Sequence, residues 1–557
     1  MDALLSPRPL PLISKFFSEV EIADIVARIQ RLRGNILAAN PTLHEVSSSA
    51  LPAQPPCDWK QTLFLMAWTL LFLIGTAFVF WRTGSRQHRY PPGPRAYPLV
   101  GNLFDFPAIS DMVLRAQKWK EDFGSIVYLT AFGKSLIILN DINDATELFE
   151  TRGAVYSNRP EFPMVGEMCG FDRLPAIASD GSSLRLRELR KLLNTEIGIK
   201  GSERYMQIME EEVCIYVKKL FEEPDNFIEH NQWFAVDIIM LISYGYRVAL
   251  KGDGHMKEAS RIMHKLSRDA QPGAWFVDLF PAMKKIPDWV PGTYFKQYAR
   301  QTRQDLDNWV KSPWELIKSQ KVKQTSFSSR LMENFPDMTP EDEDLIIWSA
   351  ASIYSAGSDT TTSSLTTFFL AMTLFPAALK AAQAEIDALI GFERRLPKFS
   401  DQPRMPYMNA LLIEIFRWGS ILPLGAPRKP ARADVYRGYT IPEDATLMAN
   451  IWGMCHQEDV YPNASAFDPS RFLGPNAQPD PRGIIFGFGR RSCPGRYLAE
   501  KTLFISVAAV VALFDIVPVQ GAPRPKYEYD DGFIRYDEPS ILLSLISPPS
   551  QNSQTTD

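Results

Sequence analysis

The amino-acid sequence predicts a mostly α-helical protein with minor β-sheets. Strand-like runs are few and short, and they lie at residues 125–129, 135–139 and 541–545. Between them, long stretches show the apolar spacing of helices. At 557 residues and with ordinary composition, the chain is long enough to bury a large core.

Residues 1–61 are predicted to be an extension with one amphipathic helix. Ser18 and Glu21 form a capping-box pattern, and the apolar residues that follow recur at helical spacing. A linker rich in serine, proline and alanine comes next. Two interpretations stay open for this segment: a helix on a membrane surface, and a short, poorly ordered extension.

Residues 62–81 are predicted to form a transmembrane anchor. They carry no charge, and about 20 residues in helical form span roughly 30 Å, which is the thickness of a bilayer core. The alternatives are a buried core helix and a signal peptide, but a signal peptide begins near residue 1. Residues 82–102 are basic and then proline-rich, which predicts a stiff hinge. The arginines of this hinge place everything after it in the cytosol by the positive-inside rule.

Overall composition excludes several classes of protein. The formal net charge of −4 gives no electrostatic case for nucleic-acid binding. The 5 cysteines are scattered and odd in number, which argues against a disulfide framework and for a reducing compartment. Neither the cysteines nor the 6 histidines show zinc-ligand spacing, so a non-haem metal site is not expected.

The most informative segment is residues 486–496, a glycine-rich loop with one cysteine just before an apolar helix. Gly487 and Gly489 let the backbone pass close to a flat, bulky group. Cys493 lies at a helix N-terminus beside Arg491, and both features favour the thiolate over the thiol. A thiolate aimed at an open cavity is a ligand for haem iron. The alternative is a buried structural cysteine after a turn.

At this loop the sequence resembles the cytochrome P450 family. The resemblance covers about residues 90–547 and points to fungal, membrane-anchored class II members of natural-product metabolism, such as enzymes like O-methylsterigmatocystin oxidoreductase. It implies a cytochrome P450 fold in a catalytic domain at residues 103–547, before a polar tail at 548–557. It also implies haem as the cofactor, with Cys493 as the axial iron ligand. The chain matches the family's haem loop at Phe486, Gly489, Arg491, Cys493 and Gly495.

A second motif lies in a long predicted helix at residues 344–374. Residues 356–362 are rich in hydroxyl groups that compete for helix carbonyls, which predicts an interruption of the helix there. Asp359 and Thr360 match the family's acid–alcohol pair, which relays protons during oxygen activation. The alternative is a polar kink in a surface helix. The pair favours a monooxygenase over family members that rearrange peroxides without dioxygen.

Charged residues elsewhere carry two further predictions. Glu414 and Arg417 share one helix face at a spacing of three residues. By resemblance they form a structural network with Arg471 that locks the loop before the cysteine.

Haem propionates need buried cations. The predicted cations are Arg491, Arg428 and, in a helix at residues 184–194, Arg190. In that helix Leu186 replaces the family's usual tryptophan, which departs from the pattern. The alternative for the basic residues of this helix is a solvated face that docks an acidic reductase.

The resemblance also assigns walls to a substrate pocket. These segments are largely apolar, so a hydrophobic substrate is expected. A terpenoid or polyketide-like scaffold follows from analogy alone. The predicted pocket residues are Met164, Phe171, Ala356, Leu424 and Phe533.

Together these observations imply a haem-thiolate monooxygenase that hydroxylates or otherwise oxidises a hydrophobic secondary metabolite with O₂. No flavin- or nicotinamide-binding stretch is present, so the electrons come from a separate NADPH–cytochrome P450 reductase; cytochrome b5 is a further candidate donor. The expected location is the endoplasmic reticulum membrane, with a single span and a cytosolic catalytic domain. Two alternatives stay open: a non-catalytic haem-binding sensor or scaffold, and a haem-thiolate desaturase or isomerase.

Overall fold

The computed structural model describes residues 89–97, 100–105, 109–249, 254–271, 273–319, 324–393, 395–518 and 543–546, together with the single residues 69 and 75. The chain divides into two compact units, Met1–Val79 and Phe80–Asp557, and nearly all of the described residues belong to the second. The predicted extension, the rest of the predicted anchor, Phe533 and the polar tail lie outside the described residues.

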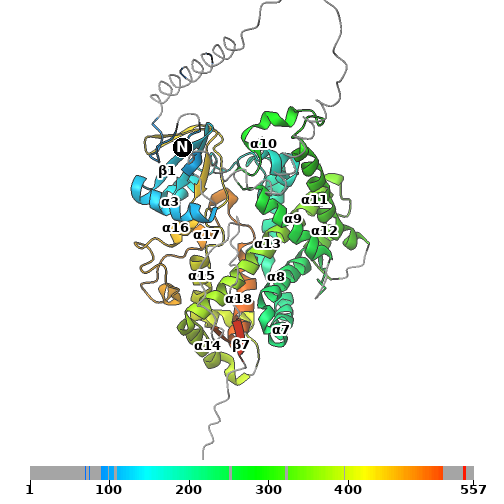
Figure 1. Cartoon of the computed structure of the whole chain (residues 1–557). Coiled ribbons are helices and arrows are strands. Elements are labelled where there is room, and N and C mark those ends of the chain that lie inside the picture. Colours follow the sequence, from blue (N-terminus) through cyan, green and yellow to red (C-terminus); the bar gives the residue numbers. More distant parts are fainter. Residues whose placement is uncertain are drawn as a thin grey trace, which may run out of the picture. The chain divides into compact units, whose positions relative to one another are not determined.

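The described part of the second unit is mostly helical, as predicted (Figure 1). Its α-helices are α3 (Ile109–Phe123), α4 (Ile142–Thr146), α5 (Leu184–Ile197), α6 (Ile199–Glu203), α7 (Met206–Glu222), α8 (Phe227–Tyr244), α9 (Gly254–Asp269), α10 (Phe276–Leu279), α11 (Tyr294–Lys318), α12 (Phe327–Asn334), α13 (Pro340–Leu374), α14 (Pro376–Ile390), α15 (Pro406–Gly419), α16 (Ile451–Cys455), α17 (Arg482–Ile485) and α18 (Arg496–Leu513).

Short 3₁₀- and π-helical turns connect these helices. The two π-helical turns are η2 (Glu147–Thr151) and η3 (Pro163–Met168). The 3₁₀ turns are η1 (Leu103–Asp105), η4 (Phe171–Arg173), η5 (Pro224–Asn226), η6 (Pro281–Lys285), η7 (Gly391–Glu393), η8 (Phe399–Arg404), η9 (Pro469–Phe472) and η10 (Gly489–Arg491).

Three small sheets accompany the helices. The predicted strands at 125–129 and 135–139 are confirmed as β1 (Ile126–Ala131) and β2 (Lys134–Leu139), which pair antiparallel. β2 also pairs in parallel with β5 (Thr446–Ala449), so the sheet order is β1-β2-β5. The other two sheets are antiparallel pairs: β3 (Asp434–Tyr436) with β4 (Tyr439–Ile441), and β6 (Asp515–Pro518) with β7 (Leu543–Ile546), which overlaps the predicted strand at 541–545.

Helix α13 runs through the middle of the helical part and is its central element (Figure 1). Thr339 caps it with its side chain, in a reciprocal capping box with Asp342, so the helix begins at Pro340. The largest apolar core combines buried residues of α8, α11, α13, α15 and α18. Gly357 allows α8 to approach closely, because a Cβ there would lie 2.7 Å from Ile239 Cδ1.

The predicted interruption of this helix at residues 356–362 is wrong, because α13 is continuous from Pro340 to Leu374. The hydroxyl groups do reach the helix carbonyls: Thr360 Oγ1 donates to Ala356 O at 2.7 Å, and Thr362 Oγ1 donates to Ser358 O at 2.9 Å. These bonds use the second lone pair of each carbonyl oxygen and leave the backbone ladder in place.

The described part of the hinge is bonded to two of the sheets. Tyr128 of β1 donates its N–H to Pro92 O at 2.9 Å, and Thr440 of β4 donates its N–H to Arg89 O at 2.7 Å. Gly93 is required here because a Cβ would lie only 1.9 Å from Tyr128 O. The proline-rich segment is thus bonded to the sheet edge and is not a free linker.

Among the described helices, none is individually long and apolar enough to cross a bilayer. One pair, Pro340–Leu374 with Pro376–Glu393, meets the criteria of length and composition together and is bent by 104° between its halves.

Candidate active site

The cysteine loop joins α17 to α18 and is built around a tight turn. Cys493 donates its N–H to Phe486 O at 2.7 Å, which closes the loop. Gly487 and Gly489 have φ values of 77° and 52°, which favour glycine. A Cβ at Gly487 would meet no protein atom within 4 Å, whereas one at Gly489 would lie 2.6 Å from Phe149 O. The first glycine leaves open space beside the loop, and the second permits close packing on η2.

The sulfur of Cys493 lies in a recess. The residue is accessible to solvent, but surrounding protein desolvates the sulfur and so raises the pKa of the thiol. Three groups act in the opposite direction: the backbone N–H groups of Gly495 and Arg496, and the charge of Arg190. The N–H groups at the start of α18 therefore favour the Cys493 thiolate, as expected. The nearby positive charge, however, comes from Arg190 and not from Arg491.

Arg491 points away from the sulfur and into the protein. Its Nε donates to Ser157 O at 2.7 Å, and its two terminal nitrogens donate to Pro175 O at 2.8 Å and to Ala178 O at 2.7 Å. Burial, followed by repulsion from Arg190, lowers the pKa of Arg491 to about 10.

Arg428 joins the same region from the segment before β3. It is buried and donates to Phe488 O at 2.6 Å, to Phe149 O at 3.2 Å and to Tyr156 O at 3.4 Å. Burial and the charge of Arg491 lower the pKa of Arg428 to about 9. Arg190, on α5, completes the predicted set and donates to Ser492 O at 2.8 Å.

Arg159 is a fourth member of this cluster, and sequence reasoning missed it. It is buried and donates to the backbone carbonyls of Ala176 at 3.1 Å, Ala426 at 2.7 Å and Pro427 at 2.6 Å. Burial lowers its pKa well below the usual value, and the charges of Arg428, Arg491 and Arg190 lower it further. No signal in a single sequence marks an isolated loop arginine of this kind.

The four arginines lack an acidic partner. Within the described residues, neither Arg159, Arg190, Arg428 nor Arg491 forms an ion pair with a carboxylate. Backbone carbonyls accept hydrogen bonds from their N–H groups but do not neutralise their charge. The carboxylates of Glu150, near Arg428, and of Asp180, near Arg491, offset that charge only in part, because the pKa of both arginines is still lowered. Such a cluster fits a group with two carboxylates, so these residues fit the haem propionates, and Cys493 fits the iron.

The predicted Glu-Arg-Arg network is present in the core. Arg417 donates from Nε to Glu414 Oε2 at 2.6 Å and from NH2 to Glu414 Oε1 at 2.7 Å. Arg471 Nε lies 3.4 Å from Glu414 Oε1, and Asp468 N–H donates to the same oxygen at 2.8 Å. Arg417 also donates to Cys455 O at 2.9 Å. The network joins α15, the last residue of α16, η9 and the chain between them.

The predicted proton-relay residues lie on the accessible part of α13. Ala356 is exposed, and Asp359 and Thr360 are half-buried, although the turns on both sides of them are buried. The Thr360 hydroxyl donates to Ala356 O, so its lone pairs face the accessible side. The pair thus lies where the central helix is accessible between buried turns.

The predicted pocket residues do not all come together. Met164 and Phe171 are buried in the large core beside residues of α13. Leu424 instead packs against α3 and β1 in a separate core, with Met112 and Val127, so the structure does not place it in one core with Met164 and Phe171. It follows a proline in a loop that the sheet covers, a neighbourhood that its own apolar character does not reveal.

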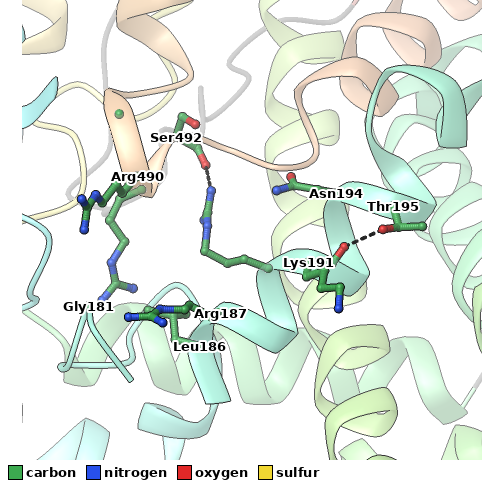
Figure 2. A pocket seen from close by; sticks show the side chains of 11 residues that line it. Gly181, Leu186, Arg187, Lys191, Asn194, Thr195, Arg490 and Ser492 are labelled. Carbon is green, nitrogen blue, oxygen red and sulfur yellow. Dashed lines mark hydrogen bonds between the residues drawn. The ribbon is translucent and has the colours of Figure 1, made fainter. Parts of the chain in front are cut away.

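A cavity of about 760 Å³ lies between α5 and the cysteine loop. Figure 2 shows residues of α5 along one wall and Arg490 and Ser492 of the loop on the other. Leu186, in place of a larger ring, lies in the lining. The charged residues that line the cavity are all basic: Arg187, Arg190, Lys191, Arg490 and Arg491.

A recess with a cysteine sulfur, open space beside Gly487 and four arginines without an ion-pair partner among the described residues meets the needs of an iron porphyrin with ionised propionates. Fold and site together therefore define a haem-thiolate protein. The chain belongs to the cytochrome P450 family, whose model matches residues 91–543.

Its relatives include named fungal monooxygenases. Cytochrome P450 monooxygenase 208 of Postia placenta is 39% identical over 87% of this chain and 95% of its own length. Cytochrome P450 monooxygenase claR of Ampulloclitocybe clavipes is 35% identical over 87% of the chain and 90% of its own length. Tryptamine 4-monooxygenase of Psilocybe cyanescens is 35% identical over 82% of this chain and 92% of its own length. The expected family, haem cofactor and monooxygenase activity are thereby confirmed.

Proposed function

We propose that this protein hydroxylates a hydrophobic secondary metabolite, with O₂ as the oxygen source and an NADPH-dependent reductase as the electron source. The observation that carries the proposal is that α13 is accessible at Ala356 and Thr360, whereas the turns before and after them are buried. A protein that only carried haem would have no need of an accessible acid–alcohol pair on the central helix. Relatives named as monooxygenases, one of them for tryptamine, support a small-molecule substrate.

In this mechanism, haem bound through Cys493 supplies the activation of dioxygen. Arg159, Arg190, Arg428 and Arg491 would hold its propionates chiefly by charge, because backbone carbonyls already accept hydrogen bonds from their guanidinium groups. The N–H groups that point at the sulfur keep it in its ligating orientation.

The proton supply is assigned to two neighbouring residues of α13. Thr360 Oγ1 is held by its bond to Ala356 O at 2.7 Å, so it accepts a hydrogen bond from a water molecule on the accessible side. The Asp359 carboxyl group replaces each proton that this water gives up. Apolar residues such as Met164 keep bulk water away from the reacting carbon.

The reductase is proposed to dock over the basic cavity beside the cysteine loop. Arg187 and Arg490 are exposed there, and Lys191 is exposed on the next turn of α5. An acidic partner surface is attracted to such a face, and the attraction weakens as salt screens it. Electrons would then enter close to Cys493, since Ser492 lines the same cavity.

Membrane attachment is proposed from two features. Residues 62–81 are uncharged and long enough for one span, which would place the catalytic domain on the cytosolic face of the endoplasmic reticulum. The segment between α9 and α11 also exposes Phe276 at 69%, Phe280 at 49% and Trp289 at 83%, and aromatic side chains of this kind favour a membrane interface.

The test is turnover by the full-length protein reconstituted with a P450 reductase, NADPH and a panel of terpenoids and aromatic amines. We expect product formation above the reductase-only blank, at a rate that falls with ionic strength. Thr360→Ala should keep the thiolate-type carbon monoxide difference band but lower product per NADPH about ten-fold or more, because proton delivery supplies on the order of 10²-fold. Cys493→Ala should abolish that band. Fully coupled turnover by the Thr360 variant would contradict the relay.

A further inference from the structure

Arg428 is bonded to three segments that lie far apart in the sequence. Its backbone is joined to β5, because Arg428 N–H donates to Leu447 O at 2.8 Å and Leu447 N–H donates to Arg428 O at 2.7 Å. Its guanidinium group donates to Phe488 O in the cysteine loop at 2.6 Å and to Phe149 O in η2 at 3.2 Å. The position of the guanidinium group therefore depends on η2 as well as on the cysteine loop.

The π-helical geometry of η2 leaves the carbonyl of Phe149 available for this bond. At the end of the turn, Arg152 N–H donates to Glu147 O at 2.9 Å, and Gly153 N–H donates to Glu150 O at 3.0 Å. Both bonds bypass the carbonyl of Phe149, which accepts from Arg428 instead. π-Helical turns of this kind occur frequently at functional sites.

The ring of Phe149 also contacts the guanidinium group. Arg428 Cζ lies 4.5 Å from the centroid of this ring, which is within the range of a cation–π interaction. Phe149 is 2% exposed, so the contact is desolvated, and desolvation strengthens such contacts. The same ring lies against Phe488, with centroids 6.1 Å apart and planes inclined by 60°. Phe149 thus touches both Arg428 and the loop residue to which Arg428 donates.

An aromatic ring suits this place better than a carboxylate. A carboxylate beside Arg428 would form an ion pair with it and would compete with a haem propionate for its charge. The negative face of a ring stabilises a cation without neutralising it. The charge of Arg428 therefore stays available to an anion on another side.

We propose that Phe149 is a positioning residue of the haem site. Its ring and its carbonyl hold the Arg428 guanidinium group where the charge of this group stabilises a propionate. Phe149 acts through Arg428 and takes no part in the chemistry. The inference rests on the proposed function, in which Arg428 is one of the cations that hold the propionates.

A double-mutant cycle tests the inference in the full-length, haem-loaded protein. Phe149→Met keeps an apolar side chain of similar size but removes the ring face, whereas Phe149→Tyr keeps the face. Each change is made in the wild type and together with Arg428→Gln. The matched control is Phe234→Met, because Phe234 is equally buried and stacks on Tyr216 at 4.5 Å. Two quantities are measured: the rate of haem transfer to apomyoglobin and the ferric–ferrous reduction potential.

We expect Phe149→Met to speed haem transfer about five-fold, since a desolvated cation–π contact is lost. It should also lower the reduction potential, in the same direction as Arg428→Gln, because a cation near the haem favours the reduced form. Phe149→Tyr should restore both values to those of the wild type, and Phe234→Met should change neither. Together with Arg428→Gln, the change to methionine at 149 should have no further effect.

Equal effects of Phe149→Met in the two backgrounds would overturn the inference, because the residue would then support the fold and not Arg428. A tyrosine variant that behaves like the methionine variant would overturn the role of the ring face, even if Arg428→Gln loads too little haem for the cycle. If Arg428→Gln loads haem but changes neither the transfer rate nor the potential, the propionate role of Arg428 itself is contradicted, and the inference falls with it. The two failures are therefore distinguishable.

Discussion

A buried guanidinium group is unfavourable unless an anion offsets its charge, and the centre of this protein holds a cluster of such groups. Arg159, Arg428 and Arg491 are each less than 10% exposed, and Arg190 lies beside them. Carbonyl bonds fix their positions but do not neutralise them. The free protein therefore carries a repulsion that the cofactor relieves, which links haem binding to the stability of the fold.

Arg159→Gln tests that link at a single position. The variant should lose haem several-fold faster than the wild type, because one cation of the propionate site is gone. In the haem-free form the same change should be neutral or stabilising, since repulsion from Arg428 and Arg491 is relieved. Transfer of haem to apomyoglobin gives the first result, and thermal unfolding of the apoprotein gives the second. Arg490→Gln, at an exposed position, is the control; a similar loss of haem in it would contradict a specific role for Arg159.

Residues set in a motif were predictable, whereas Arg159 was not. Cys493 and Arg491 stand at fixed spacing among glycines, so the local sequence alone marks them. The partners of Arg159 include Ala426, which is 267 residues away in the chain, and a lone arginine in a loop carries no local mark. The environment of Cys493 shows the same limit, because the charge near it comes from Arg190 on α5 and not from its neighbour in the sequence.

At the scale of elements, charge pairs determine how α15 is attached to the loops after α16. Glu414 and Arg417 are completely buried, and Arg471 reaches them from η9. The spacing of Glu414 and Arg417 on one helix face predicted their ion pair. The same sequence could not predict that Arg417 also donates to the carbonyls of Cys455 and Ala466, which lie far along the chain. The network holds these loops together before the chain reaches the cysteine.

Glu414→Gln should destabilise the protein by about 3–5 kcal/mol, because it leaves two buried guanidinium groups without a counter-charge. We expect a lower melting temperature and a smaller yield of haem-loaded protein, while the fraction that folds keeps the thiolate-type carbon monoxide band. Arg404→Gln removes an ion pair whose arginine side chain is 57% exposed, so it should cost less than about 1 kcal/mol. Comparable losses in the two variants would contradict a structural role for the network.

Element prediction succeeded for β1 and β2, which have 6 residues each, and failed for the shortest strands and at the hydroxyl-rich turns of α13. β3, β4 and β5 contain only three or four residues each, too few for an alternating pattern to be recognised. For α13, the hydroxyl groups suggested a break, but their side chains bond to carbonyls that already accept helix bonds. Gly357 likewise serves the packing of α8 and not a local opening.

At the scale of the whole molecule, the fold class was predictable and the assembly of the site was not. Length and helical patterns fix a mostly α-helical chain, and the cysteine loop identifies the family, which supplies the arrangement. The hinge shows why the sequence alone falls short. Its proline-rich stretch predicts a stiff hinge, but nothing in the stretch indicates that Gly93 lies against Tyr128 at the edge of the sheet.

Stability of the whole fold should depend on pH through one buried carboxyl group. Asp237 of α8 is fully buried and accepts the N–H of Val248 at 2.6 Å. Burial raises its pKa from 3.8 to about 7, and the carboxylate of Glu212 adds to this effect, while the N–H of Val248 and the charge of Arg247 oppose it. The folded protein thus binds one more proton than the unfolded chain between these values. The stability that the Asp237 carboxyl group contributes is therefore fully present below its unfolded pKa of 3.8, and it is lost as the pH rises through its folded pKa of about 7.

Asp237→Asn mimics the protonated group, so the variant should gain over the wild type as pH rises. We expect nearly equal melting temperatures at about pH 4.5 and an advantage of about 2–4 °C for the variant at about pH 8, measured by circular dichroism at constant ionic strength. Asp401→Asn is the control, because the pKa of Asp401 is shifted in the opposite direction: a hydrogen bond from Arg395 lowers it to about 2. That change should destabilise the protein at both pH values. An Asp237 variant whose melting temperature follows the wild type across this range would show that the carboxyl group does not retain its proton in the fold.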